Sequence, residues 1–469
     1  MLKLVLITPF LALSHLWIIS EKEVVQLKWS ALVWSFILFI EIFLLGGALQ
    51  EGFSCFQDRG EFTQLRWGVF GVDGLSYCFL LLVILLLPIC ILVSWESIKC
   101  LVREFLICLF VLSWLLIGVF TIMDILGFYI FFEAVLIPMF LIVILWGSRE
   151  EKIRAGFYLF FFTFFGSVFL LLGILILYIK VGATDYMYIY NYKINNYWQC
   201  LLFILFFLGF AIKVPLFPFH IWLPQAHVEA PVAGSVLLAG ILLKLGGYGF
   251  LRFSLGLFPV GAEYCSSFVL TLGLLAVIYG SLVTCRQVDL KRVVAYSSVA
   301  HMGVVVLGLF SLTSEGEIGG VYLMFAHGLV SPGLFIAVTC LYDRYNTRLI
   351  RYYRGIWVKM PVFCFFFFLL TLANLGLPLS LNFVGEFLCL MGLFQYSWYF
   401  GLCSCLSVVL SAVYSLYLYN RVAFGAYSKY MVGGRDLNRR EVYVFVVLLC
   451  LVYLLGICPN VLGNCLTYY

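Results

Sequence analysis

Residues 208–220 read LGFAIKVPLFPFH and place one lysine inside an apolar stretch of helical length. Lys213 is followed at once by Val214 and Pro215, and Pro218 comes soon after. Proline lacks an amide hydrogen and clashes with the preceding turn, so this sequence predicts that a helix breaks just after Lys213. Broken helices at membrane depth are tolerated where freed carbonyl groups face protein or water, and in transporters they mark ion sites. Whether this segment lies in a membrane depends on the rest of the chain.

The composition makes lipid the solvent for most of the chain. The 469 residues are 64% hydrophobic and 11% charged, with a mean hydropathy of +1.11. Soluble proteins are about 45–50% apolar and about 25% charged, and a soluble fold of this length has no core large enough for so much apolar surface. The formal charge of +5 is small, and no basic run alternates with aromatic residues. Nucleic acid is therefore not expected as a partner.

The sixteen cysteines are scattered through apolar runs and form no CxxC motif. A free cysteine behaves as a small apolar residue, whereas iron–sulfur ligation needs clustered thiolates. The chain also contains no GxGxxG loop. We therefore expect neither a metal site nor a nicotinamide, flavin or iron–sulfur group on this chain.

About 20 apolar residues are needed to cross a membrane as a helix, and cuts at charge clusters and turn residues predict fourteen such spans. The predicted fold class is an all-α polytopic membrane protein. The cuts are least sharp at Asp124, where two spans meet with almost no loop, and within the run 361–397. The predicted spans are centred near residues 11, 39, 84, 113, 135, 167, 211, 243, 276, 301, 329, 378, 412 and 452.

The Lys and Arg residues predict how the spans are oriented. Twenty of the 28 lie in the loops after odd-numbered spans, six (including Arg59 and Arg66) lie in the other loops, and two lie within spans. Basic residues favour the inner side of a membrane, so both termini are expected on the outer side. The first twenty residues lack the features of a signal or transit peptide and are interpreted as the first span, which suggests synthesis inside an organelle or a bacterium. The tyrosine-rich segment 185–199 is expected at the outer interface, without a chemical role.

Five charged residues lie within the predicted spans, where each costs several kcal/mol unless it is paired or hydrated. They are Glu41, Glu133, Lys213, Lys244 and Glu386. Glu133 lies near the middle of span five and matches Lys213 in depth. The two are predicted either to form a protonatable pair or to be a structural ion pair between helices. Glu41 has no comparable neighbours, and we favour a structural role for it.

Glycines and prolines accompany the other buried charges. Lys244 begins the run KLGGYG, in which small residues allow close helix packing and are expected to leave room for water. The alternative is a lysine that extends to the interface. Pro378 is predicted to break span twelve before Glu386, as Pro215 breaks span seven after Lys213. Paired broken helices are typical of transporters built from two similar halves.

Two histidines, His301 and His327, also lie deep within predicted spans. Because histidine titrates near neutral pH, they are candidates for a proton relay between Lys244 and Glu386. The alternative for each is an ordinary hydrogen-bonding role. His327 and Ser331 are one helical turn apart and could share a water molecule.

Five longer stretches can be compared with known families: FFEAVLIPMF, LGFAIKVPLFPFHIWLPQAHVEAPVAGSVLLAGILLKLGGYG, QVDLKRVVAYSSVAHMG, LYDRYNTR and LANLGLPLSLNFVGEF. They resemble the antiporter-like membrane subunits of respiratory complex I (NADH:ubiquinone oxidoreductase), and among these the mitochondrial type of chain 4. The resemblance covers about residues 71–425. Glu386, where sister chains tend to have lysine, favours chain 4, and the lack of a long C-terminal lateral helix argues against chain 5. Gln225, within QAHVEAP, stands where the family often has a carboxylate, a change expected to be tolerated in a loop.

The resemblance implies two inverted bundles of five helices each, with helices 7 and 12 broken. The corresponding division is 1–103 for helices 1–3, 104–256 for a first antiporter-like half with helices 4–8, 257–425 for a second with helices 9–13, and 426–469 for helix 14.

The resemblance also implies roles for individual residues. Glu133 would pair with Lys213, and Lys244 would be the central proton carrier. His301 and His327 would connect it to Glu386, the terminal group. The implied activity is redox-driven proton translocation by a subunit of NADH:ubiquinone reductase that has no redox site of its own.

The implied setting is the mitochondrial inner membrane, with a chain encoded in the organelle. NADH, FMN, iron–sulfur clusters and ubiquinone are expected on partner subunits, and no cofactor on this chain. The expected partners are lipids and the other membrane-arm subunits, including the sister antiporter-like chains. Two alternatives remain open: a subunit of a freestanding multi-subunit cation/proton antiporter, and a structural membrane scaffold that needs none of the buried charges.

Overall fold

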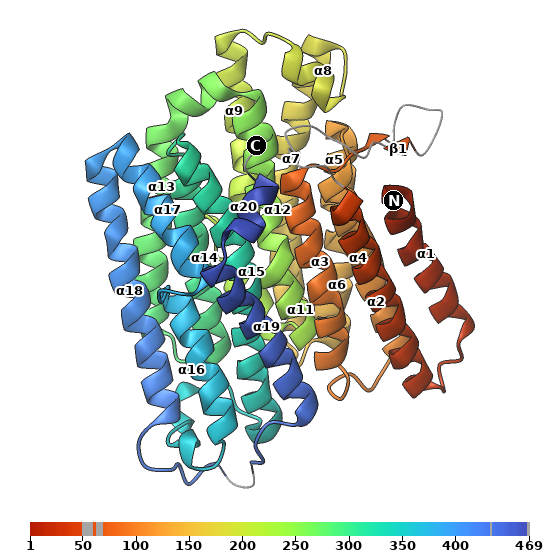
Figure 1. Ribbon diagram of the computed structural model, residues 1–469, viewed down its shortest axis with the longest axis vertical. Helices are drawn as coiled ribbons and strands as arrows, with labels where there is room; N and C mark the ends of the chain where they lie inside the picture. Colours follow the sequence, from red (N-terminus) through yellow and green to blue (C-terminus); the bar gives the residue numbers. More distant parts are fainter. Residues whose placement is uncertain (49–59, 62–68, 432–433, 467–469) are drawn as a thin grey trace.

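The computed structural model describes residues 1–48, 60–61, 69–431 and 434–466, and these residues are almost entirely helical (Figure 1). The predicted all-α membrane fold is confirmed. Arg59 and Arg66, which enter the charge count above, lie outside the described residues. A short antiparallel hairpin, β1 (Gly60–Glu61) with β2 (Val69–Phe70), precedes the third helix.

The helices up to the first break are α1 (Leu2–Ile18), α2 (Val24–Ala48), α3 (Gly74–Val93), α4 (Val102–Thr121), α5 (Ile125–Ala134), α6 (Leu136–Trp146), α7 (Lys152–Val181), α8 (Tyr186–Asn191) and α9 (Asn196–Lys213). The next are α10 (Trp222–Glu229), α11 (Val232–Leu237), η1 (Leu238–Leu242), α12 (Leu243–Gly249), η2 (Phe250–Leu255), α13 (Pro259–Arg286), α14 (Leu290–Leu309) and α15 (Ser314–Tyr345). The last are η3 (Ile350–Tyr352), η4 (Ile356–Val358), α16 (Pro361–Leu375), α17 (Leu381–Tyr396), α18 (Trp398–Ala423), α19 (Arg439–Ile457) and α20 (Asn460–Leu466).

Twelve helices in the described part of the chain are long and apolar enough to cross a membrane. In that count α5 with α6, and α11 through η2, are each one continuous span. Three shorter apolar helices are α1, α16 and α17. If α1 crosses once and the α16–α17 pair crosses once, the total is the predicted fourteen, and this number stays a prediction. As expected, α4 and α5 meet at Asp124 with a very short connection.

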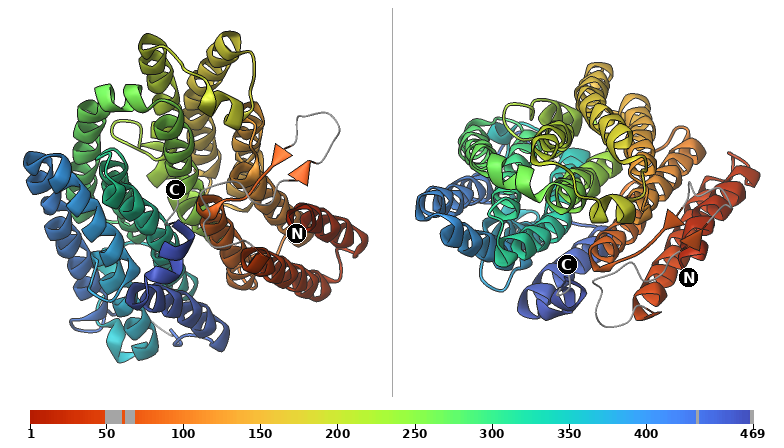
Figure 2. Two further views of the ribbon diagram at one scale, coloured as in Figure 1. Left: turned by 45° about the horizontal axis from the view of Figure 1, so that its top comes forward. Right: turned by 90° about the horizontal axis from the view of Figure 1, so that it is seen from above.

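The helices differ in how deeply they lie in the bundle. The segment Val232–Leu255 and helix α15 are buried along their whole apolar windows, whereas only about a third of the α18 and α19 windows is buried. The N-terminal helices α1 and α2 run along one edge of the molecule (Figure 2). A helix that is apolar on all sides is stable only when it is surrounded. Charges on Val232–Leu255 and α15 are therefore enclosed by protein rather than by lipid.

The two ends of the bundle carry different features. The N-terminus, α20 and α8 lie toward the upper end in Figure 1, and the loop between α18 and α19, whose sequence includes Lys429 and Arg435, lies at the lower end. We refer to the lower end as the basic end and to the upper end as the outer end. This arrangement agrees with the predicted placement of the termini opposite the basic loops.

The first predicted helix break is confirmed. Helix α9 ends at Lys213, and α10 begins only at Trp222. Carbonyl groups freed by the break find other donors: the Trp222 indole nitrogen donates to the Ile212 carbonyl at 3.0 Å, and the Leu216 amide donates to Ala211 at 3.0 Å. The break is therefore stabilised by local hydrogen bonds that replace those of the helix.

The second predicted break is also confirmed. Helix α16 ends at Leu375 and α17 begins at Leu381, with the Ser380 hydroxyl capping the new helix by accepting from the Phe383 amide. Gly376 follows α16 with a φ of +81°, and a Cβ there would lie 2.7 Å from Oε2 of Glu386. Only glycine combines this left-handed backbone with such a close approach. The break thus brings the chain directly against the Glu386 carboxylate.

Three local features differ from the expectations. QAHVEAP is not a loop, because residues 222–229 form α10. Span five is interrupted at Val135, directly after the turn that carries Glu133. The Lys244 span contains two π-helical segments, η1 and η2, one on each side of α12. Such π segments widen the helix locally and are frequent at functional sites.

The glycines after Lys244 serve close packing, as predicted, but they do not leave room for water. A Cβ on Gly246 would lie 2.5 Å from the Val214 side chain, and one on Gly247 would lie 2.2 Å from Sδ of Met324. A Cβ on Gly249 would lie 2.4 Å from the Phe210 ring. The three glycines therefore let α9 and α15 approach α12 directly, and the expectation of a hydrated space beside them is wrong.

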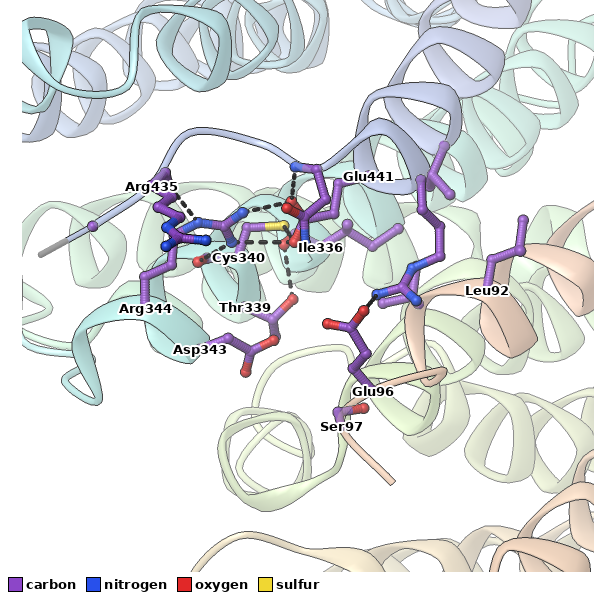
Figure 3. A pocket seen from close by; sticks show the side chains of 15 residues that line it. Leu92, Glu96, Ser97, Ile336, Thr339, Cys340, Asp343, Arg344, Arg435 and Glu441 are labelled. Carbon is purple, nitrogen blue, oxygen red and sulfur yellow. Dashed lines mark hydrogen bonds and ion pairs between the residues drawn. The ribbon is translucent and has the colours of Figure 1, made fainter. Parts of the chain in front are cut away.

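A cavity of about 370 Å³ opens at the basic end between α3, α15 and α19 (Figure 3). On its wall Arg344 binds the Glu441 carboxylate through both terminal nitrogens, at 2.6 and 3.1 Å. Arg440 pairs with Glu96 at 3.0 Å. These bonds fix the start of α19 to α15 and α3. None of the six predicted site residues lines this cavity.

Replacement of Gly246 by alanine is expected to destabilise the bundle by about 1–3 kcal/mol, the usual cost of overpacking a core. The added methyl group would meet both the Val214 side chain and the backbone of α9. Thermal unfolding of the variant in detergent measures the effect. The matched control is Gly47→Ala, because a Cβ at Gly47 meets nothing within 4 Å. Equal stability of the two variants would contradict the close contact of α12 with α9.

Candidate functional site

The centre of the buried polar network is a contact between Lys244 and His327. Lys244, on α12, and His327, on α15, are both 0% exposed. The lysine ammonium lies 2.8 Å from Nδ1 of His327 and also donates to the Ala239 carbonyl. A protonated lysine can only donate, so His327 then accepts at Nδ1 and carries its own proton on Nε2. The Lys244 span and α15 are thus joined by a hydrogen bond that can transfer a proton.

His301 continues the network from His327 toward α17. The ring centres of the two histidines are 5.7 Å apart. On its other side, Nδ1 of His301 lies 3.2 Å from Oε1 of Glu386. Four of the predicted residues, Lys244, His327, His301 and Glu386, therefore form one chain across α12, α15, α14 and α17. Polar atoms are in direct contact at the Lys244–His327 and His301–Glu386 steps of this series. Between the two histidines, the structure gives only the distance of 5.7 Å between ring centres.

Tyr414, on α18, completes the surroundings of His301 and was not predicted. Its hydroxyl lies 3.0 Å from Nε2 of His301. Tyr414 lies in a helix of mixed polarity, where the sequence does not indicate which tyrosines are buried. In the structure it is only 2% exposed. Both ring nitrogens of His301 are thereby engaged, one by a carboxylate and one by a phenol.

Two cavities of about 10 Å³ each flank Tyr414, and each has room for about one water molecule. The first also touches His301 and Glu386 and includes hydroxyl groups from α13 and α18. The second includes polar groups from α14, α16 and α18. The polar residues that line them, besides those named, are Ser281, Ser407 and Ser411 in the first cavity, and Ser297, Thr371, Asn374 and Ser415 in the second.

The expected pair of Glu133 and Lys213 is only partly formed. The Lys213 ammonium lies 3.4 Å from the Phe132 carbonyl and 4.1 Å from the centre of the Phe132 ring. Among the described residues, no ion pair within 4 Å joins Lys213 to Glu133, whose Oε1 is buried without a hydrogen-bond partner. The two charges nevertheless interact electrostatically. The structure places Lys213 against Phe132, the residue before Glu133.

The backbone next to Lys213 lies close to the helix that carries Lys244. Val214, the next residue, packs on Gly246, and the Gly246 position approaches the Phe210 carbonyl. The break in α9 and the Lys244 span thus meet within one turn of both lysines.

A second buried cluster lies between Lys244 and the basic end, and it was not predicted. Arg348 pairs with Glu229 at 3.2 Å, and the Lys291 ammonium donates to the Ala230 carbonyl at 3.0 Å. Both bases were counted as loop charges, but they are almost fully buried. The sequence could not predict their burial, because their partners lie far away in the chain, on α10 and in the turn after it.

His227, on α10, connects this cluster to the centre. Its ring is stacked on Phe335 with 4.4 Å between ring centres, and within the described residues neither ring nitrogen has a hydrogen-bond partner. It interacts electrostatically with both Lys291 and Lys244. The sequence contained a signal in QAHVEAP, where a histidine and a glutamate follow a broken helix, but the segment was interpreted as a loop.

Two further predicted residues, Glu41 and Ser331, differ in their surroundings. Thr8 donates to the Glu41 carboxylate at 2.9 Å and ties α1 to α2, which agrees with a structural role. The Ser331 hydroxyl and Nε2 of His327 both lack hydrogen-bond partners in the described structure. A water molecule shared by His327 and Ser331 stays a prediction.

Residues 122–411 match the sequence model of a family described as NADH:quinone oxidoreductase/Mrp antiporter, transmembrane. The chain belongs to this family. NADH-ubiquinone oxidoreductase chain 4 of Metridium senile is 52% identical over 98% of this chain and 96% of its own length. The protein of the same name from Mycosarcoma maydis is 48% identical over 98% of this chain and 97% of its own length. The resemblance to the chain 4 family is confirmed.

Two solved structures share the fold. A chain of respiratory complex I from Thermus thermophilus with bound NADH has a TM-score of 0.90 and 31% identity, over 99% of this chain and 97% of that one. A chain of an archaeal membrane-bound sulfane sulfur reductase has a TM-score of 0.89 at 20% identity, over 100% of this chain and 96% of that one. The second likeness concerns the fold alone.

Replacement of Tyr414 by phenylalanine tests the contact with His301. The variant leaves Nε2 of a buried histidine without its partner, which is expected to cost about 1–3 kcal/mol of stability. Tyr417→Phe, on the exposed side of the same helix at 54% exposure, is the matched control and is expected to be neutral. The free energy of unfolding in mixed detergent micelles measures both. A Tyr414→Phe protein as stable as the control would contradict the contact.

Proposed function

We propose that this chain is the chain 4 subunit of NADH:ubiquinone oxidoreductase, and that it translocates protons through its buried polar residues. The observation that carries the proposal is the chain from Lys244 to Glu386, with polar contacts of 2.8 and 3.2 Å at its two ends. Buried ionisable groups in a membrane are costly and usually functional. A purely structural membrane protein would not need this series of buried ionisable side chains.

The electrostatic change that drives the transfer begins at Glu133 and Lys213. In the state described here, the Lys213 ammonium contacts the Phe132 carbonyl rather than the Glu133 carboxylate. Closing the pair stabilises the charged form of both groups, and opening it destabilises them. A change in the pair therefore changes the field at Lys244, on the helix that packs against the end of α9.

The next steps run through hydrogen bonds. Lys244 gives its proton to Nδ1 of His327, and the imidazolium that forms releases the proton bound to Nε2. That proton reaches His301 over the 5.7 Å between the ring centres, by one bridging water molecule or by rotation of a ring. His301 passes a proton to Glu386 across the 3.2 Å contact. Glu386 is the last group of this series, and Tyr414 and a small cavity with room for one water molecule lie beside it.

Local electrostatic interactions are strong enough to supply the energy that proton transfer against the membrane potential requires. Moving one charge against about 100 mV costs about 2.3 kcal/mol. One pKa unit corresponds to about 1.4 kcal/mol. A change of about two units at each site therefore suffices, and this is within the range that a charge 4–6 Å away produces.

The driving reaction takes place outside this chain. Oxidation of NADH and reduction of quinone belong to partner subunits, which hold the NADH, FMN, iron–sulfur and ubiquinone sites. This chain then has no redox site of its own, and its partners are the other membrane-arm subunits. The mitochondrial relatives support the inner mitochondrial membrane as its location.

One alternative has a specific observation in its favour. The family description joins NADH:quinone oxidoreductases with Mrp antiporters. A subunit of a freestanding cation/proton antiporter would carry the same buried residues and would work without NADH, with an activity that depends on sodium. The high identity to chain 4 proteins along nearly the full chain favours the first proposal.

The two proposals predict different assemblies. After mild detergent extraction and native electrophoresis, this chain is expected to migrate with the band that stains for NADH dehydrogenase activity. Mass spectrometry of that band identifies the chain. Migration in a smaller band without NADH activity, combined with sodium-dependent transport in vesicles, would contradict the complex I assignment and support the antiporter.

Alanine at Lys213, Glu133 or Lys244 is expected to lower proton-coupled NADH oxidation by at least about tenfold, since each removes a charge whose transfer step then costs more than about 1.4 kcal/mol extra. The assembled complex is expected to persist. Proton uptake by vesicles during NADH oxidation measures the effect, and Lys22→Ala and Glu23→Ala, at exposed positions, are the controls. Normal pumping by the Lys213→Ala variant would refute the pathway, and a silent Lys244→Ala would indicate a scaffold.

A further inference from the structure

The helix that carries Lys244 holds two more buried polar residues on the same face. Tyr248 and Arg252 follow Lys244 at intervals of four residues, the spacing that places side chains above one another on a helix. Arg252 lies in η2, the π-helical segment that follows α12. In Figure 1, α12 lies above α11, so this row of residues runs from Lys244 toward the outer end.

Arg252 forms a buried ion pair with Asp73, at the start of α3. The side chains are only 6% and 9% exposed. Asp73 also accepts from the Ser76 amide at 3.0 Å and so caps α3. The Nε group of Arg252 donates to the Tyr248 hydroxyl at 3.3 Å. The positive member of the pair thus lies on the helix face of Lys244, and the negative member lies on a neighbouring helix.

Aromatic rings enclose this pair. The guanidinium lies 5.4 Å from the ring centre of Tyr248 and 5.6 Å from that of Tyr186. Tyr186 belongs to α8, in the tyrosine-rich segment for which the sequence suggested no chemical role. Burial raises the pKa of Tyr186, so its phenol stays neutral and adds no negative charge to that of Asp73. Three phenylalanines pack around Tyr248: Phe79, Phe120 and Phe128.

The two halves of the protein therefore differ in what surrounds their buried charges. In the second half, Glu386 and His301 border a small cavity with three serine hydroxyls. In the first half, the route from Lys244 to the outer end meets a guanidinium and a wall of aromatic rings. A guanidinium cannot be deprotonated in proteins, and a fixed arginine charge in a narrow passage repels protons. Stability alone does not explain the pair, because buried ion pairs add little net stability.

We infer that the Arg252–Asp73 pair, with its aromatic surroundings, is an electrostatic seal that closes the first half to protons at the outer end. A proton on Lys244 then has one route forward, sideways to His327 and the second half. The inference rests on the proposed function and adds the residues that give the path its direction. Without the seal, protons would leak through the first half whether or not NADH is oxidised.

Passive proton leak in vesicles tests the seal. The assembled complex is placed in phospholipid vesicles, a pH gradient is imposed without NADH, and its decay is followed with a pH-sensitive dye. The double variant Arg252→Gln with Asp73→Asn removes both charges but keeps groups that can hydrogen-bond. Its leak is expected to rise about tenfold, which corresponds to a barrier lower by about 1.4 kcal/mol. NADH oxidation is expected to continue, with a smaller steady gradient.

A matched pair provides the control. Arg103 and Glu21 form an ion pair of 2.5 Å at the edge of the bundle, and its side chains are 19% and 60% exposed. The double variant Arg103→Gln with Glu21→Gln is expected to leak like the unaltered protein. An assembled Arg252/Asp73 variant with an unchanged leak would overturn the seal. Equal leak increases in both double variants would overturn it as well, because the effect would then not be specific to this pair.

If the double variant does not assemble, the single variant Arg252→Lys tests the same inference. Lysine preserves the charge at neutral pH but can lose its proton, whereas arginine cannot. The titratable groups that face this position are Asp73 of α3, Tyr248 of the same helix and Tyr186 of α8, with Tyr190 beside it. The leak of this variant is expected to rise from neutral to alkaline pH more steeply than that of the unaltered protein. Identical pH profiles would overturn the seal.

The leak measurement separates this inference from the proposed function. An unchanged leak rejects the seal, while proton uptake driven by NADH in the unaltered protein still supports the function. If the unaltered complex moves no protons during NADH oxidation, the function itself fails, whatever the leak.

Discussion

The contact between the Lys244 ammonium and the His327 ring is the interaction on which the rest of the architecture depends. A cation with no exposure to solvent needs partners that replace its water shell. His327 and the Ala239 carbonyl supply them. To bring these groups together, the Lys244 span departs twice from α-helical geometry, and three glycines let its neighbours approach to direct contact. Two fully buried helices in the middle of the bundle are the consequence.

The broken helices follow from the same requirement. A continuous helix satisfies its own backbone and offers nothing to a buried ion, whereas a break exposes carbonyl groups and allows the chain to bend. At the first break, Lys213 is the last helical residue, and the chain after it packs against the Lys244 helix. At the second, Gly376 lies directly on the Glu386 carboxylate. Both breaks thus place a charge next to a point where the backbone can move.

Buried ion pairs lie beyond the centre in both directions. Toward the basic end, Arg348 pairs with Glu229, and His227 interacts electrostatically with both Lys291 and Lys244. Toward the outer end, Arg252 pairs with Asp73 behind a wall of aromatic rings. Both pairs contain an arginine, which does not titrate, but toward the basic end it is accompanied by His227 and Lys291, and toward the outer end by aromatic rings. This asymmetry in the first half matches a path that receives protons from one side only.

The sequence by itself determined the membrane class, the two helix breaks and the four residues of the central chain. Each depends on local chemistry: apolar length, the missing amide hydrogen of proline, and the cost of a charge at membrane depth. It did not determine how residues on different helices meet. Only the tertiary structure revealed the roles of Tyr414, His227 and the Arg252–Asp73 pair. It also showed that Lys213 and Glu133 do not form a close ion pair. Partners on helices far apart in the chain are set by packing angles and by which side of each helix is turned inward, and no local pattern encodes them.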